Sequence, residues 1–509
     1  MVAPYPQWSG SVCVIDTSYR IQKNGGTVVE LFARSREGHS LTILVHGLRP
    51  HVVISTPDSP SSAILESRLS KVRDEDLVTH VHEPQILWSE NGEKPHWRVD
   101  VSQPNIVPKL REVLRKEWIV SSSDIVFPLR LFLDLDVGPH IEVNGDVIWA
   151  QRRAPSDLLP NFPEFTPQHA ESIREAGGSG LYPTDMILSC NLKNIVETEA
   201  FRTPFVTASF DLETSVINPQ ILCAAMVIDR DGERTEYAID GPEKEILSRL
   251  TRIIQDEDPD IITGYNIDNF DLPRIDQRTS DLGGSSDEFV ALEMFGWSRR
   301  SLRDGKRGLP SRNQSRRWNI TGRCVMDAWW EARMALRPQR ESLRFVAELL
   351  FPERPELRKM EIDASKMDEE WKNRPDEVLR YCVMDTILPL EILDAIHAIR
   401  SKEALASVSK IPIQRAISGT TSQWIDSLMI RLADRENIAV PQTRNVGRSD
   451  QIAGGHVQDV ESGLHPWVAV LDFKSMYPSI MIEQNICFTT RIDSKDAPEN
   501  GVNIAPDGT

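Results

Sequence analysis

The sequence lacks the features that would place it in a membrane or outside the cell. No apolar run approaches the ~20 residues that span a bilayer. Residues 1–9 show no basic stretch followed by an apolar core, so we expect no signal peptide. The six cysteines are scattered and form no CxxC pair, which argues against zinc sites and disulfide frameworks. We therefore predict a cytoplasmic protein with reduced thiols and no membrane partner.

Positive charge is also scarce. The chain has 58 Lys and Arg residues against 76 Asp and Glu, and its net charge is −18. This balance disfavours general binding to nucleic acid, which requires basic side chains to displace phosphate counterions. One polar segment is an exception and is either a solvated loop or a strip that contacts DNA. It contains Arg299, Arg300, Arg303, Lys306, Arg307, Arg312, Arg316, Arg317 and Arg323.

The length of 509 residues predicts roughly three domains of ~150 residues each. Residues 1–140 form an N-terminal domain of mixed strands and helices, with short β-type runs at 12–15, 28–32 and 41–45 and a helical run at 106–117. Residues 141–200 are rich in Pro, Gly and Asn, which is typical of a connector or surface insertion.

Strands and helices alternate from residue 201 to 397, which predicts an α/β layer structure. The expected strands are 205–210, 221–229 and 260–265, the helices are 243–255 and 376–397, and a Gly/Ser/Arg-rich loop covers 277–320. Residues 398–440 form a helical connector, with a helix at 419–436, and 441–509 contain a buried-type strand at 466–471. The fold class is α/β and α+β, multidomain.

Three short motifs place carboxylates where they could meet. In FDLET, period-two geometry puts Asp211 and Glu213 on one side of a strand end. YNIDNFD (265–271) follows the third strand, and in YCVMD Tyr381 and Asp385 are one helical turn apart. Each motif alone is more typical of a loop, a helix cap or a surface pair. Together they supply what hydrolysis with two metal ions about 4 Å apart requires, including a hydroxyl that can orient water.

The three motifs, in this order, resemble the exonuclease motifs of family B DNA polymerases. These polymerases belong to the DEDD exonucleases, which have a ribonuclease H-like fold. The resemblance implies that Asp211, Glu213, Asp271 and Asp385 hold two Mg²⁺ or Mn²⁺ ions and that Tyr381 orients the attacking water. It also implies DNA contacts for Asn266 and Phe270, with Asp268 as a bystander. Residues 322–327 resemble the stretch between the second and third motifs.

Residues 470–480, VLDFKSMYPSI, resemble motif A of the family's polymerase palm. This resemblance implies that Asp472 binds a catalytic metal and that Ser475, Met476 and Tyr477 contact the incoming nucleotide. Upstream, Gly454 and Gly455 resemble the linker between the two active sites and would contact DNA, although Ile452 replaces the family's tyrosine.

The N-terminal region is similar to that of archaeal family members. Residues 14–19, 48–50 and 124–130 match stretches that line a uracil-sensing pocket there, which implies a role for Tyr19, Pro50 and Arg130. Ordinary core packing of Tyr19 and Pro50 is the competing interpretation. His96 stands where the family has a small apolar residue.

The resemblance implies a component of a DNA-directed DNA polymerase in replication or repair, with a 3′→5′ proofreading exonuclease. Its partners would be primer–template DNA, single-stranded 3′ ends and a sliding clamp, in association with the nucleoid. The family's Asp-Thr-Asp strand does not occur in the sequence, so we expect polymerisation, and use of deoxynucleotides, only with a C-terminal fragment. A split subunit, an intein-interrupted half and a truncated frame all fit this expectation. A stand-alone DEDD exonuclease and a non-catalytic DNA-binding scaffold remain alternatives.

Overall fold

The computed structural model describes residues 5–22, 26–56, 58, 60–71, 78–89, 92–116, 118–150, 183–283, 288–300, 308–313, 317–357, 362–442, 455–456, 458–487, 490, 492 and 498. The chain divides into two compact units. The first comprises Met1–Leu87 and Pro95–Gln442, and the second comprises Trp88–Lys94 and Thr443–Thr509. Among the described residues, no helix combines the length and apolarity needed to cross a bilayer.

The first unit begins with a sheet that closes on itself. Its strand order is β1 (Gln7–Ile21), β2 (Thr27–Ser35), β3 (Ser40–His46), β10 (Met186–Asn191), β9 (His140–Ala150) and β11 (Ile195–Glu197), and β1 also pairs with β9. The predicted strands 12–15, 28–32 and 41–45 are therefore confirmed. The prediction that 141–200 is a connector is wrong at both ends, because β9, β10 and β11 complete this sheet. Its middle, 151–182, lies outside the described residues.

A smaller sheet has the order β5 (Val78–Val81), β7 (Gly92–Val101), β4 (His51–Ser55) and β8 (Ile119–Ser121). β6 (Gln85–Ser89), α1 (Ser62–Lys71), η1 (Pro104–Ile106), α2 (Val107–Leu114) and α3 (Phe127–Asp134) complete this region. Trp97 is buried with apolar side chains of β4, α1 and α2 in its own core. α3 instead contributes Phe127, Leu131 and Phe132 to the core of the closed sheet.

The third sheet carries two of the predicted carboxylates. Its order is β14 (Glu233–Ile239), β13 (Ile221–Arg230), β12 (Val206–Thr214), β15 (Ile261–Gly264) and β18 (Cys324–Asp327). β13 is antiparallel to both of its neighbours, β12 and β14, whereas β12, β15 and β18 run parallel to one another. This is a mixed α/β layer, as the alternation of elements predicts.

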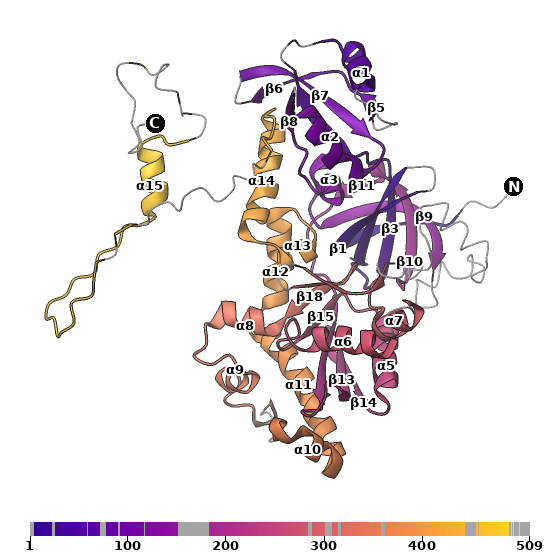
Figure 1. Cartoon of the computed structure of the whole chain (residues 1–509), viewed down its shortest axis with the longest axis vertical. Coiled ribbons are helices and arrows are strands. Elements are labelled where there is room, and N and C mark those ends of the chain that lie inside the picture. Colours follow the sequence, from indigo (N-terminus) through magenta and orange to yellow (C-terminus); the bar gives the residue numbers. More distant parts are fainter. Residues whose placement is uncertain are drawn as a thin grey trace. The chain divides into compact units, whose positions relative to one another are not determined.

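Helices cover both faces of the third sheet (Figure 1). α5 (Glu243–Glu257), α6 (Asp271–Gly283) and α7 (Glu288–Phe295) share a core with Phe210 and Leu212 of β12. On the other face, α11 (Pro375–Ala395) packs its Cys382 and Val378 against Cys223 and Ala225 of β13. Successive side chains alternate between the faces of a strand. Asp211 and Glu213 therefore point towards α11.

The remaining helices of the first unit pack on this sheet, on the closed sheet or on one another. They are α8 (Ala328–Leu336), α9 (Leu343–Leu350), α10 (Met367–Asn373), α12 (Ala398–Ser409), α13 (Ile413–Ser418) and α14 (Thr421–Arg435), with η3 (Leu192–Asn194), η5 (Pro355–Leu357) and η6 (Ala364–Lys366) as single 3₁₀ turns. Thr420 and Gln423 form a capping box that begins α14. The prediction of one loop over 277–320 is wrong, because α6 continues to Gly283 and α7, β16 (Ser311–Arg312) and β17 (Trp318–Asn319) follow.

A buried ion network joins the closed sheet to the third sheet. Asp260 accepts hydrogen bonds from Arg34 of β2 at 2.8 and 2.9 Å and from Arg299 at 2.8 Å. Asp258 accepts from Arg299 at 2.8 Å and from Arg323 at 2.7 Å. Burial alone would raise the pKa of Asp258, but the guanidinium groups of Arg299 and Arg323 hold that pKa well below its usual value.

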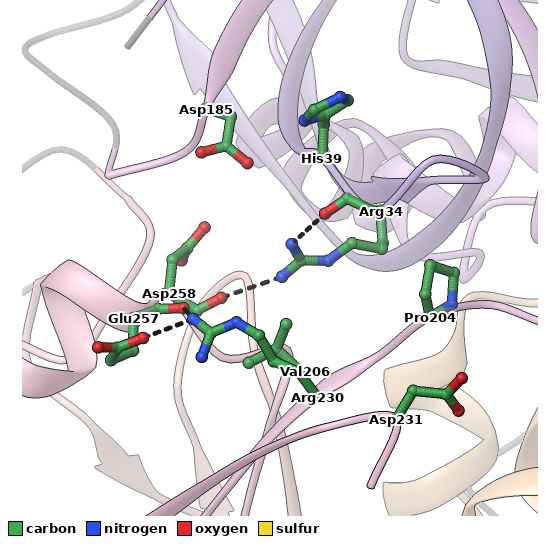
Figure 2. Close-up of a pocket in the computed structure, with 10 residues that line it drawn as sticks. Arg34, His39, Asp185, Pro204, Val206, Arg230, Asp231, Glu257 and Asp258 are labelled. Carbon is green, nitrogen blue, oxygen red and sulfur yellow. Dashed lines mark hydrogen bonds and ion pairs between the residues drawn. The ribbon is translucent and has the colours of Figure 1, made fainter. Parts of the chain in front are cut away.

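A pocket of about 360 Å³ opens beside this network. Figure 2 shows Arg34 pointing across it towards Asp258, while Arg230 pairs with Glu257 at 2.5 Å. Arg34 and Arg230 are thus both bound to acidic or carbonyl groups of the protein. Through Arg34, the ion network contributes to packing between the two sheets.

The described residues of the second unit include one helix, α15 (Met476–Glu483). The predicted strand at 466–471 is wrong: these residues have no strand partner, and Leu471 is 95% exposed. A strand forms only where a neighbour supplies hydrogen bonds. The described part of this unit contains no such neighbour.

Candidate active site

The strand carboxylates lie against α11. Asp211 is half-buried and Glu213 is buried near the end of β12. Cys382 of α11 directs its Sγ at Asp211, 3.6 Å from Oδ2. Ligand atoms of Asp211, Glu213 and Cys382 all lie within 4.8 Å of one another. The structure therefore brings the first and third motifs together on one face of the sheet.

The loop carboxylate joins them from α6. Asp271 is the first residue of this helix and is buried. Burial, and then the neighbouring carboxylates of Asp211 and Asp327, raise the pKa of Asp271 well above its usual value. Its buried Oδ1 has no hydrogen-bond partner in the described part of the chain. A divalent cation between Asp211 and Asp271 would offset both the repulsion and the desolvation, so these residues fit a metal site.

The third motif lies inside α11. Tyr381, Cys382 and Asp385 are all buried in this helix. Asp385 is three residues after Cys382 and four after Tyr381, so the three share one side of the helix. Since Cys382 faces Asp211, that side is the one turned towards β12. Burial raises the pKa of the Cys382 thiol well above its usual value, and contact with Cys223 and the Asp211 charge raise it further.

Asp327 fixes the loop that carries Asp271. Its Oδ1 accepts hydrogen bonds from the backbone N–H of Asn266 at 2.7 Å and of Trp329 at 3.0 Å. Its Oδ2 accepts from the N–H of Asp268 at 3.1 Å. Asn266 adopts a left-handed conformation, with φ of 68°. Burial raises the pKa of Asp327 to about 7.

The sequence patterns do not assign Cys382 or Asp327 to this site, although Cys382 contacts Asp211 and Asp327 holds the loop before Asp271. A signal was present for Asp327, because an Asp before a helical run is a typical N-cap. No spacing rule connects Cys382 to residue 211.

The other predicted DNA contacts differ in exposure. Phe270 is 43% exposed, and the Arg274 guanidinium lies 5.7 Å from its ring centroid. The prediction that the basic segment lies at the surface, as a solvated loop or a DNA contact, is wrong for Arg299 and Arg323. Both are fully buried in the ion network. The physical reason is that Asp258 and Asp260 neutralise them.

The remaining residues of the basic segment have different surroundings: two bind backbone carbonyl groups, one is exposed, and four lie outside the described residues. Arg300 donates to the carbonyl of Tyr19 at 2.7 Å, and Arg317 donates to the carbonyl of Ile417 at 2.9 Å. Arg312 is exposed, and its Nη2 donates to Oδ1 of Asn269, in the loop before Asp271, at 3.4 Å. Arg303, Lys306, Arg307 and Arg316 lie outside the described residues, as does Gly454. Gly455 is exposed in the second unit.

Tyr19, Pro50 and Arg130 line one pocket of about 250 Å³ in the N-terminal region. Tyr19 packs edge-on against Phe127, with ring centroids 5.6 Å apart. Arg130 is buried and donates to the Ser122 carbonyl. The three predicted residues are therefore neighbours, and the role of their pocket stays a prediction.

The motif A residues lie in the second unit. Asp472 precedes α15, Ser475 is its N-cap with φ of 50°, and Met476 and Tyr477 form its first turn. Tyr477 is 75% exposed and Met476 is 42% exposed. All four side chains are thus accessible within this unit.

Comparisons with known proteins cover both units. Residues 241–344 match the family model for the exonuclease domain of DNA polymerase family B, and residues 411–506 match the model for DNA polymerase family B. The DNA polymerase delta catalytic subunit of Drosophila melanogaster is 24% identical over an alignment of 528 positions, gaps included, that covers 91% of this chain and 46% of that protein. The subunit of Caenorhabditis elegans is 30% identical over 335 residues, 64% of this chain and 29% of that one.

The fold agrees with a solved structure. The family B DNA polymerase of the archaeon Pyrobaculum calidifontis matches with a TM-score of 0.68 and 22% identity, over 98% of this chain and 60% of that chain. This chain spans about half the length of the curated relatives that it matches.

Proposed function

We propose that the chain belongs to the family B DNA polymerases and that residues 201–397 form the 3′→5′ proofreading exonuclease of a replication or repair polymerase, which the two family matches support. One observation carries this proposal. Asp211 and Glu213 of β12, with Cys382 of α11, form one cluster, and Asp271 of α6 interacts with Asp211. Carboxylates from β12 and α6 that meet beside the third-motif helix α11 favour metal-dependent phosphodiester hydrolysis over a purely structural role.

Asp211, Glu213, Asp271 and Asp385 would hold Mg²⁺ or Mn²⁺. When bound, two such ions supply an activated water and stabilise the leaving oxygen. Tyr381, on the same side of α11 as Asp385, would orient the attacking water through its hydroxyl.

Phe270 would hold the 3′ end of single-stranded DNA. Its half-exposed ring, with the Arg274 guanidinium over it, offers a stacking platform for a base and a positive charge for a phosphate. Asn266, four residues earlier in the same loop, would contact the DNA through its amide. Arg312 is an exposed cation near this loop and replaces Arg299 and Arg300 as the candidate for a backbone contact.

The second unit would supply part of a polymerase site. In this proposal Asp472 binds a catalytic metal, Ser475, Met476 and Tyr477 meet the deoxynucleotide, and Gly454 and Gly455 contact DNA. The family match over 411–506 supports this and counts against a stand-alone exonuclease. Primer extension, a C-terminal fragment, a sliding clamp and association with the nucleoid belong to the same proposal.

The pocket of Tyr19, Pro50 and Arg130 would sense uracil in a template strand. The support is that a planar base can fit an opening of about 250 Å³ lined by these side chains. Equal affinity of the chain for uracil-containing and thymine-containing single strands would leave the pocket as packing only.

The exonuclease is tested with a 3′-labelled oligonucleotide and Mg²⁺. Changing Asp211→Ala together with Glu213→Ala should abolish digestion, because both carboxylates are metal ligands in the proposal. The matched control is Glu233→Ala with Glu236→Ala, two exposed acids of β14. This control should digest at the parent rate. Digestion by the first double variant at the parent rate would overturn the assignment.

A further inference from the structure

Cys382 places a thiol inside a cluster that otherwise offers oxygen ligands. We propose that its thiolate, together with Asp211 and Glu213, binds a thiophilic divalent cation of the Zn²⁺ or Cd²⁺ class. The proposed exonuclease centre would then accept a kind of metal that carboxylates alone bind less selectively. This inference deepens the proposed function and rests on it, because it uses the same two carboxylates.

The distances fit one shared ion. With Zn–S of about 2.3 Å and Zn–O of about 2.1 Å, a tetrahedral ion separates its sulfur and oxygen ligands by about 3.6 Å. The Sγ of Cys382 lies 3.6 Å from Oδ2 of Asp211. Glu213 completes a set in which every pair of ligand atoms is within 4.8 Å.

The thiol is held in position by its surroundings. Cys382 is fully buried and packs with Val378 of its own helix and with Cys223 and Ala225 of β13. Its Sγ also donates to the backbone carbonyl of Asp211 at 3.5 Å, which holds it beside this residue. The sulfur therefore remains beside the carboxylates whether or not a cation is present.

The chemistry of sulfur determines which cation benefits. Mg²⁺ prefers oxygen ligands, whereas thiolate sulfur favours Zn²⁺ and other soft ions. On binding, the thiol would lose its proton to solvent and the S–metal bond would form, so that no oxidant or reductant is needed. Of the five buried cysteines, Cys382 is the one in a ligand cluster with the first-motif carboxylates, among the residues the structure describes.

The experiment uses the whole chain with Cys487→Ser, which removes the exposed thiol. Cd²⁺ is added without Mg²⁺, and binding is followed by the ultraviolet charge-transfer absorption of cadmium–thiolate bonds. We expect a saturable band at one ion per chain. Adding Cys382→Ser should remove the band and weaken Cd²⁺ binding at least about tenfold, since even loss of a partner behind a ligand costs ~10–100-fold.

The matched control is Cys190→Ser, which alters a buried thiol of the closed sheet. It should keep the band. Cys382→Ala serves as a second variant, and circular dichroism melting verifies that both Cys382 variants are folded. A band that persists in folded Cys382→Ser protein, or no band in the parent, would overturn the inference. If the parent digests DNA with Mg²⁺ yet shows no band, only the inference fails. A band without digestion would instead count against the proposed function.

Discussion

The buried ion network gives a direct measure of what a neutralised charge contributes to stability. Asp258 is 1% exposed and accepts from two guanidinium groups that are fully buried. Changing Asp258→Asn removes the negative charge that faces Arg299 and Arg323, and only Arg299 keeps a second carboxylate partner, Asp260. Removing one partner of a buried ion pair costs ~3–5 kcal/mol. Because Asn keeps an oxygen that can accept a hydrogen bond, we expect a loss of about 3 kcal/mol in the free energy of unfolding.

The same substitution at an exposed ion pair tests whether burial determines the size of this loss. Asp231 bonds Arg202 at 2.5 Å, but their side chains are 59% and 70% exposed. Asp231→Asn should therefore cost no more than ~1 kcal/mol. Both variants are compared with the parent by urea unfolding, followed by circular dichroism. Equal losses at the two positions would refute the argument that burial determines the effect.

The pH dependence of this effect has a definite sign. The arginines lower the pKa of Asp258 in the folded state, so folding favours its ionised form. The stabilisation is complete above the ordinary pKa of an aspartate, ~3.9, and is lost as the pH falls below it. The difference between the parent and the Asp258→Asn variant should therefore shrink in acid.

Three further predictions concern single side chains. Tyr381→Phe should slow hydrolysis by ~10²–10⁴ yet leave metal binding by calorimetry unchanged, and loss of metal would assign it a structural role. Phe270→Ala should weaken single-stranded DNA binding by ~1–3 kcal/mol in fluorescence anisotropy, and unchanged binding would exclude stacking. Burial raises the pKa of Asp16 in the folded chain to about 6, so folding favours the protonated form of this carboxyl. That contribution to the free energy of unfolding is lost as the pH rises through about 6. Asp16→Asn should therefore stabilise the chain by ~1 kcal/mol or more at pH 8 but not at pH 4, measured by urea unfolding, and an equal effect at both values would contradict this.

The sequence predicted those parts of the fold that depend on local patterns. β12, β13, β15, α5 and α11 follow from period-two and helical spacing, and Pro375 marks the start of α11. The carboxylate set was predicted from three short, contiguous motifs, and its role in holding metal ions stays a prediction. Local patterns do not show which strands pair, and this is why β9 and β10 were assigned to a connector.

The burial of charged side chains was the other feature that could not be predicted from the sequence. Arg299 and Arg323 have the composition of a surface loop, and only the three-dimensional position of Asp258 and Asp260 explains why they are inside. The proximity of Cys382 to Asp211 likewise depends on how α11 lies on β12, which no sequence spacing encodes.

Two of the hydrogen bonds to Asp327 bear on how the sequence of the neighbouring loop could vary. They connect the end of β18 to Asn266 and Asp268, while β15 ends at Gly264 and α6 begins at Asp271. Both ends of the intervening loop are thus fixed, and its middle is held by backbone N–H groups, which every residue except proline possesses. Apart from Asn266, whose left-handed φ favours Asn or Gly, and the proposed DNA contact Phe270, point substitutions in this loop should be tolerated more readily than insertions or deletions of even one codon, because a change in length would move Asp271 away from Asp211.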